Sequence, residues 1–121
     1  MLLVEDDPFA RRLALSVLRD IGIGRIAVAN DGHGALQTLF GGDTFDLVIS
    51  DWNMPEMSGL NLLKKVRETW PALPFIMLTG NTTGDSVLTA RDSGVNAYVV
   101  KPFAKRQLAA KIAAVLNLKA V

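Results

Sequence analysis

The chain has 121 residues, half of them apolar, and a formal net charge of +1. This length predicts one domain with a core of its own, and the near-zero charge gives no reason to expect nucleic-acid binding. Cysteine is absent, which excludes disulfides, thiolate metal sites and thiol catalysis. No apolar run approaches the roughly 18 residues of a membrane span, and no signal-peptide pattern is present. We therefore expect a cytoplasmic protein with no membrane partner.

Short apolar runs alternate with helical patterns along the chain. The runs are predicted strands, and they lie at residues 1–4, 25–29, 47–49, 75–78 and 97–100. Apolar residues at helical spacing predict helices over about 8–21, 32–40, 60–70, 83–93 and 104–117. This alternation predicts a doubly wound α/β fold over residues 1–121, in which helices cover both faces of a five-stranded parallel sheet.

The first predicted strand runs directly into three acidic residues, Glu5, Asp6 and Asp7. Asp7 followed by Pro8 predicts a helix start, because Asp is a favoured N-cap and Pro is favoured at the first helical position. Capping explains Asp7 but leaves Glu5 and Asp6 without a structural role.

Polar residues follow four of the predicted strands, namely Glu5-Asp6-Asp7, Asp51, Thr79-Gly80-Asn81 and Lys101-Pro102. The carboxyl ends of parallel strands share one edge of the sheet, outside which ligands bind. Carboxylates about 4 Å apart repel by roughly 4 kcal/mol per pair at an effective dielectric near 20. Such a cluster must bind protons or a cation, and an all-oxygen set suits Mg²⁺. A divalent ion, a lysine and a hydroxyl around one carboxylate are what phosphoryl transfer onto that carboxylate requires.

The motifs VEDD, DWNMPEMSG, the Thr-Gly pair after the fourth strand and YVVKPF span essentially the whole chain. In these motifs and their spacing the sequence resembles the receiver domains of two-component response regulators, and it looks closest to the single-domain chemotaxis (CheY-like) type. The resemblance implies a flavodoxin-like (CheY-like) sheet with strand order 2-1-3-4-5.

The same resemblance implies roles for individual residues. Asp51 is the expected phosphoryl acceptor, assisted by Lys101 and Thr79, which would bind phosphoryl oxygens. Mg²⁺, or Mn²⁺ as a substitute, would be held by Glu5, Asp6, Asp51 and the backbone carbonyl of Asn53. Asn53 and Asn81 are expected to tune the lifetime of the phosphoryl group, and the peptide bond before Pro102 is expected to be cis.

The implied function is that of a signalling switch. A sensor histidine kinase or phosphotransfer protein would supply the phosphoryl group from a phosphohistidine. Thr79 would then move toward the phosphate, and Tyr98 would turn inward. The face formed by the fourth helix, the fifth strand and the basic last helix would change and control an output protein. We expect no independent turnover beyond the chain's own phosphorylation and dephosphorylation.

Three alternative functions compete with this one. An aspartyl-phosphate hydrolase of the haloacid-dehalogenase kind needs a second Asp where this chain has Asn53, and that family lacks the paired acids of the first strand. A flavin-binding domain needs a Ser/Thr/Gly-rich loop after the first strand. A protein-binding module of the same fold that works without phosphorylation remains open.

Two features depart from the expected pattern, and the end of the chain leaves its setting open. The first strand starts at Met1, so we expect a clipped or short N-terminus that weakens this edge of the site. Gly84 is expected to loosen the fourth helix, because Gly costs a helix interior ~1 kcal/mol relative to Ala. No effector segment follows the last helix, so the chain would be a stand-alone regulator, a relay intermediate or a piece of a longer protein.

Overall fold

A computed structural model of the chain describes residues 1–80, 84–101 and 103–116. Its strands are β1 (Leu2–Val4), β2 (Ala27–Ala29), β3 (Val48–Asp51), β4 (Phe75–Thr79) and β5 (Ala97–Val100). Its helices are α1 (Pro8–Asp20), α2 (Gly32–Phe40), α3 (Gly59–Thr69), α4 (Gly84–Asp92) and α5 (Lys105–Val115). All strand pairs are parallel and the strand order is β2-β1-β3-β4-β5, which confirms the predicted fold and topology.

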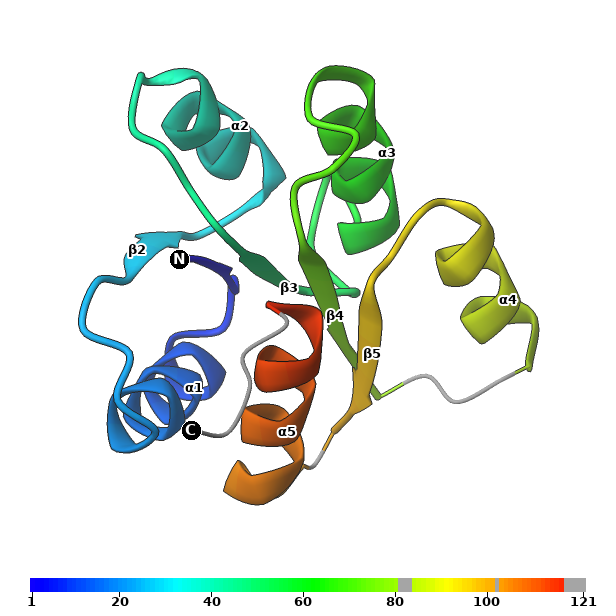
Figure 1. The fold of residues 1–121 in the computed structure, drawn as a ribbon. Coiled ribbons are helices and arrows are strands. Elements are labelled where there is room, and N and C mark those ends of the chain that lie inside the picture. The colour runs from blue at the N-terminus through cyan, green and yellow to red at the C-terminus, as the bar shows by residue number, and fades with distance from the viewer. Residues whose placement is uncertain (81–83, 102, 117–121) are drawn as a thin grey trace.

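The helices cover both faces of the sheet. Helices α1 and α5 lie against one face, α2 and α3 lie against the other, and α4 lies beside β5 at the edge (Figure 1). The central strands are therefore buried on both sides, and β1, β3 and β4 are buried along their whole length. This two-sided burial is why these strands read in the sequence as continuous apolar runs rather than as alternating patterns.

Side-chain capping sets the start of α1, as expected, and also the start of α2. The Asp7 side chain accepts a hydrogen bond from the backbone N–H of Phe9 at 3.2 Å, so Asp7 is the N-cap of α1. Asp31 does the same for α2, accepting from Gly34 N at 2.7 Å. Beyond α1, Gly22 adopts a φ of +95°, a conformation that glycine reaches without steric cost.

One predicted strand boundary differs from the structure for an identifiable reason. Strand β2 begins at Ala27 rather than at residue 25, because its partner β1 begins at Leu2 and Leu2 lies opposite Ala27 in the register. The start of the helix predicted over 83–93 lies at the limit of the described residues, and the structure gives this helix as Gly84–Asp92.

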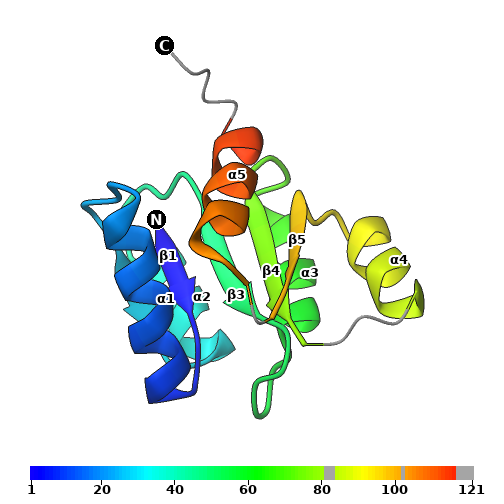
Figure 2. The same ribbon diagram turned by 90° about the horizontal axis from the view of Figure 1, so that it is seen from below.

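The carboxyl ends of the strands gather at one edge of the sheet, at the bottom of Figure 2. The connections from β1 to α1 and from β3 to α3 both leave from this edge, and α5 starts there after β5 (Figure 2). In the part of the chain that the structure describes, no helix is long and apolar enough to cross a membrane.

Candidate functional site

Three acidic side chains meet where β1 and β3 end. Val4 lies opposite Ser50 in the register of these neighbouring strands, so the residues that follow, Glu5 and Asp51, emerge side by side. One carboxylate oxygen from each of Glu5, Asp6 and Asp51 lies within 4.8 Å of the others. The predicted meeting of these carboxylates is therefore present in the structure.

Lys101 reaches the same cluster from the end of β5. Its ammonium nitrogen Nζ lies 3.1 Å from Oδ1 of Asp51 and 3.1 Å from Oε2 of Glu5. Burial alone would lower the pKa of Lys101, but the charges of Asp51 and Glu5 and the hydrogen bonds to them outweigh burial, and the pKa is raised. The lysine therefore stays positively charged at neutral pH and bridges two carboxylates.

Glu5 is the most deeply placed of the three acids. Its side chain is almost completely buried, and burial together with the negative charge of Asp51 raises its pKa, against the opposing effect of Lys101. Its Oε1 atom also accepts a hydrogen bond from the backbone N–H of Asp7 at 3.3 Å. The raised pKa means that burial and the charge of Asp51 together outweigh the stabilisation that Lys101 gives to the ionised carboxylate of Glu5.

A cation fits this donor set. Three carboxylates supply hard oxygen ligands on one side of the cluster, which is the chemistry that Mg²⁺ and Mn²⁺ prefer. Asn53, the fourth predicted ligand through its backbone carbonyl, lies in the exposed loop that follows β3.

The loop after Asp51 is held close to the site by Gly59, at the start of α3. The backbone N–H of Gly59 donates to Trp52 O at 2.7 Å, and Trp52 N donates to Leu78 O at 2.8 Å. A Cβ atom at Gly59 would overlap the carbonyl oxygen of Asp51 and approach Met77 Sδ to 2.8 Å. Only glycine permits this close return of the chain to the backbone of Asp51.

Thr79 and Tyr98 lie on neighbouring strands and face the same side of the sheet. Thr79 is fully buried at the end of β4, and Tyr98 lies opposite Met77, two residues before Thr79. The Tyr98 ring is partly buried and meets the Trp52 ring edge-on, with centroids 6.3 Å apart. Of the other predicted site residues, Asn81 and Pro102 lie outside the described residues.

Sequence reasoning missed Arg11 on α1. Its Nη1 atom donates to the backbone carbonyl of Glu5 at 3.2 Å and to Oδ1 of Asn30 at 2.8 Å. It thereby fixes the end of β1 against the loop after β2. No motif marks this role, because an arginine on the outer side of a helix is usually solvated.

Comparison with known proteins gives a clear family match. The family model "Response regulator receiver domain" matches residues 1–113. Chemotaxis protein CheY of Pseudomonas aeruginosa is 43% identical over 114 residues, which cover 93% of this chain and 91% of that protein.

Solved structures agree with the fold. Vibrio cholerae chemotaxis protein CheY4 superposes with a TM-score of 0.86 at 32% identity, over 94% of this chain and 95% of that one. The receiver domain of a Pseudomonas aeruginosa sensor histidine kinase superposes with a TM-score of 0.85 at 25% identity, over 96% and 95% of the two chains. That structure has a magnesium ion coordinated in its active site cleft.

Proposed function

The chain belongs to the response regulator receiver domain family and is CheY-like, and from this premise we propose that it is a phosphorylation-operated signalling switch with Asp51 as acceptor. The observation that carries the proposal is the position of Lys101, whose ammonium lies 3.1 Å from both Asp51 and Glu5 at the carboxyl edge of the sheet. A carboxylate clamped by a lysine beside two further acids is suited to receive a phosphoryl group.

The proposed metal is Mg²⁺, with Mn²⁺ as a substitute. Glu5, Asp6 and Asp51 would hold it together with the carbonyl of Asn53, and the close carboxylate oxygens support this assignment. When bound, such an ion neutralises charge on the phosphoryl oxygens. Burial and the charge of Asp51 raise the pKa of Glu5, and a bound cation would favour its ionised form.

In the proposed reaction a carboxylate oxygen of Asp51 attacks the phosphorus of a phosphohistidine presented by a sensor histidine kinase or phosphotransfer protein. The O–P bond forms as the P–N bond breaks, and the histidine nitrogen keeps the electron pair. Lys101 and the Thr79 hydroxyl bind phosphoryl oxygens, and the acyl phosphate later yields to water. Asn53 and Asn81 are proposed to tune that last step.

The proposed output is a change of the face formed by α4, β5 and α5. A phosphoryl group adds about −1.5 to −2 charges beside Lys101. Thr79 would move toward this charge and Tyr98 would turn inward, since both face the same side of the sheet. An output protein would read the changed face, to which α5 contributes the exposed residues Lys105, Arg106 and Lys111.

Labelling with an autophosphorylated histidine kinase and Mg²⁺ tests the acceptor. We expect Asp51→Asn to lose the label and the wild-type chain to lose it when Mg²⁺ is chelated. If Asp51→Asn keeps the label, Asp51 is not the phosphoryl acceptor. A Tyr98→Ala variant that takes the label but still signals normally to an output partner would contradict the proposed coupling.

One alternative is a protein-binding module of the same fold that works without phosphorylation. Partner binding that is identical with and without beryllofluoride, a mimic of the phosphoryl group, would favour this alternative. The salt-bridged Lys101 favours the phosphorylation switch, because a plain binding module has no need to gather like charges at a buried edge.

A further inference from the structure

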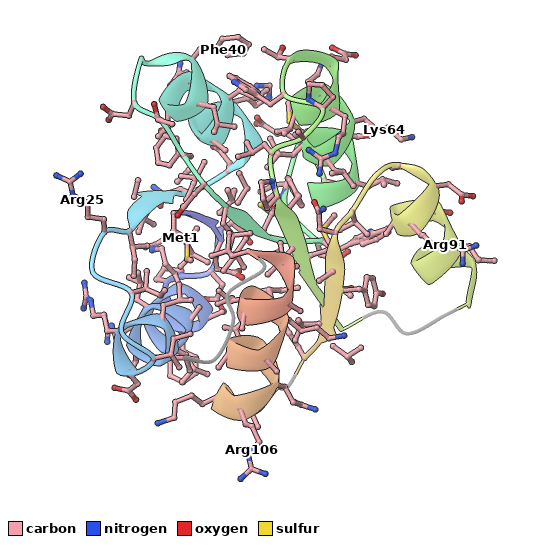
Figure 3. The ribbon with its side chains drawn as sticks, viewed as in Figure 1. Met1, Arg25, Phe40, Lys64, Arg91 and Arg106 are labelled. Carbon is pink, nitrogen blue, oxygen red and sulfur yellow. The ribbon has the colours of Figure 1, made fainter. Side chains whose placement is uncertain are left out.

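Arg11 on α1 is held differently from most arginines of the chain. Arg25 and Arg106, for example, are exposed and extend outward from the molecule (Figure 3). Arg11 is only partly exposed, and its Nη1 atom donates both to the carbonyl oxygen of Glu5 and to Oδ1 of Asn30. One guanidinium nitrogen thus joins the end of β1 to the loop after β2.

The carbonyl group that Arg11 holds belongs to the peptide unit between two acidic residues of the proposed metal site. The carbonyl of Glu5 and the N–H of Asp6 are parts of one planar unit, so a hydrogen bond to this oxygen fixes the direction in which the chain enters Asp6. The backbone N–H of Glu5 donates to Ala29 O, at the end of β2, at 3.1 Å. The backbone of Glu5 is therefore tied to β2 on one side and to α1 on the other.

Asp6 depends on this backbone more than Glu5 does. The carboxylate of Glu5 has partners of its own, Lys101 Nζ at 3.1 Å and the backbone N–H of Asp7 at 3.3 Å. Asp6 is half-buried, and within the described part of the chain no side chain forms a salt bridge with it. One of its carboxylate oxygens nevertheless lies within 4.8 Å of those of Glu5 and Asp51. The position of Asp6 is thus set mainly by the backbone that carries it.

We propose that Arg11 is a positioning residue for the cation site, which holds the peptide unit between Glu5 and Asp6 in place and is itself held by Asn30. This inference rests on the proposed function, of which the metal site is a part. Arg11 touches neither the cation nor the phosphoryl group, and it acts through the two acids. Partners of this kind, behind the metal ligands, typically change metal affinity or activity by about 10–100-fold when they are lost.

The positive charge of Arg11 distinguishes positioning from simple electrostatics. A positive charge near a cation site repels the cation, so removing the guanidinium charge would by itself tighten Mg²⁺ binding. Loss of the hydrogen bond to Glu5 O acts in the opposite direction, because it frees the peptide unit that leads into Asp6. The two explanations therefore predict opposite signs for the same substitution.

Calorimetric titration with MgCl₂, without any phosphoryl donor, measures the effect on binding. For Arg11→Met we expect the dissociation constant of Mg²⁺ to rise about tenfold or more. Asn30→Ala leaves Arg11 with one of its two acceptors and should raise the constant about threefold, as for the loss of one hydrogen bond. In Arg11→Met/Asn30→Ala the constant should equal that of Arg11→Met, because Asn30 acts through the arginine.

Arg12→Met is the matched control. Arg12 is the next residue on α1 and is exposed, so this substitution removes the same charge at a neighbouring position. Its dissociation constant for Mg²⁺ should equal that of the wild type or be lower. Urea unfolding without Mg²⁺ identifies the variants that fold. Asn30→Ala changes an exposed side chain and keeps the proposal falsifiable if Arg11→Met does not fold.

Phosphoramidate, a small donor that carries the P–N bond of a phosphohistidine, separates metal affinity from chemistry. In Arg11→Met the Mg²⁺ concentration that gives half the maximal labelling rate should rise in step with the dissociation constant. The rate at saturating Mg²⁺ should approach that of the wild type. A general loss of structure would instead lower the rate at every Mg²⁺ concentration.

Two results would overturn the positioning role of Arg11. They are a dissociation constant for Mg²⁺ that does not rise in Arg11→Met or, if that variant does not fold, in Asn30→Ala, and a rise in Arg12→Met as large as that in Arg11→Met. A wild-type chain that binds Mg²⁺ but accepts no phosphoryl group from phosphoramidate or from a histidine kinase would instead refute the proposed function.

Discussion

The ammonium of Lys101 lies 3.1 Å from Oδ1 of Asp51, although Asp51 ends β3 and Lys101 directly follows β5, which is not a neighbour of β3. Strand β4 separates β3 from β5, so the lysine side chain spans the end of β4 to reach the carboxylate. The backbone N–H of Lys101 donates to Thr79 O at 2.8 Å, which fixes the lysine backbone at the end of β4. One side chain thus links the ends of β1, β3 and β5.

Lys101→Met should destabilise the protein in the absence of divalent cations. The substitution leaves Glu5 and Asp51 close together without their shared cation, and charged hydrogen bonds of this kind contribute about 1.5–3 kcal/mol each. Because Lys101 is partly exposed, we expect a loss near the lower end, about 1–2 kcal/mol. Urea unfolding at pH 7 measures this, with the exposed Lys105→Met as control. Equal stability of the two variants would contradict the inference that Lys101 stabilises the protein by bridging Glu5 and Asp51.

Mg²⁺ should stabilise the protein more at pH 8 than at pH 5. The raised pKa of Glu5 means that the folded state holds this proton more tightly than the unfolded chain does. Without metal, the contribution of Glu5 to stability is therefore greatest below its unfolded pKa and is lost as the pH rises through the raised pKa. A bound cation offsets the loss once the carboxylate is ionised, by about 1.4 kcal/mol at ten times the dissociation constant.

Thermal unfolding with MgCl₂ against NaCl of equal ionic strength measures the effect. In Glu5→Gln the difference between the two pH values should shrink, because the titrating group is gone. A Mg²⁺ effect of the same size at both pH values in the wild type would count against the assignment of Glu5.

The sequence was sufficient to predict most of the fold, because the strands are buried on both faces and their apolar runs stand out from the helical periods. It also predicted that Glu5, Asp6, Asp51 and Lys101 meet, since parallel strands bring their carboxyl ends to one edge. It did not predict Gly59 or Arg11. Their roles depend on distances between backbone segments, and no local pattern encodes these.

Arg67 on α3 donates hydrogen bonds to the segment between α4 and β5, so replacing it tests how that segment is held. Its guanidinium donates to Trp70 O, Leu73 O and Gly94 O and to the side chain of Asn96, at 2.6–3.0 Å. Burial lowers its pKa, and no carboxylate among the described residues forms a salt bridge with it. Two of its acceptors, Trp70 O and Gly94 O, lie just beyond the ends of α3 and α4, where the helix dipoles favour a cation.

Arg67→Met should therefore cost about 1–3 kcal/mol, because it removes the arginine donor from the partly buried Leu73 O and from Gly94 O. Trp70 O and the Asn96 side chain keep donors, from Leu73 N and Phe75 N. Hydrogen exchange should increase at residues 93–96, where α4 joins β5, before it increases in β3. Lys65→Met, an exposed change on the same helix, is the control and should have little effect. Unchanged exchange at residues 93–96 in Arg67→Met would contradict the anchoring role.

Gly59→Ala should damage the site through the backbone alone. The added methyl group would overlap Asp51 O and press on Met77 Sδ, so either α3 or the loop after β3 must move. We expect a loss of about 1–3 kcal/mol, as for other overpacked positions, and slower labelling of Asp51 from phosphoramidate, since the displaced backbone carries the acceptor. Gly24→Ala is the matched control, because a Cβ there would meet nothing within 4 Å. If both glycine variants unfold and accept phosphoryl groups alike, the close return of the chain at Gly59 does not set the geometry of the acceptor.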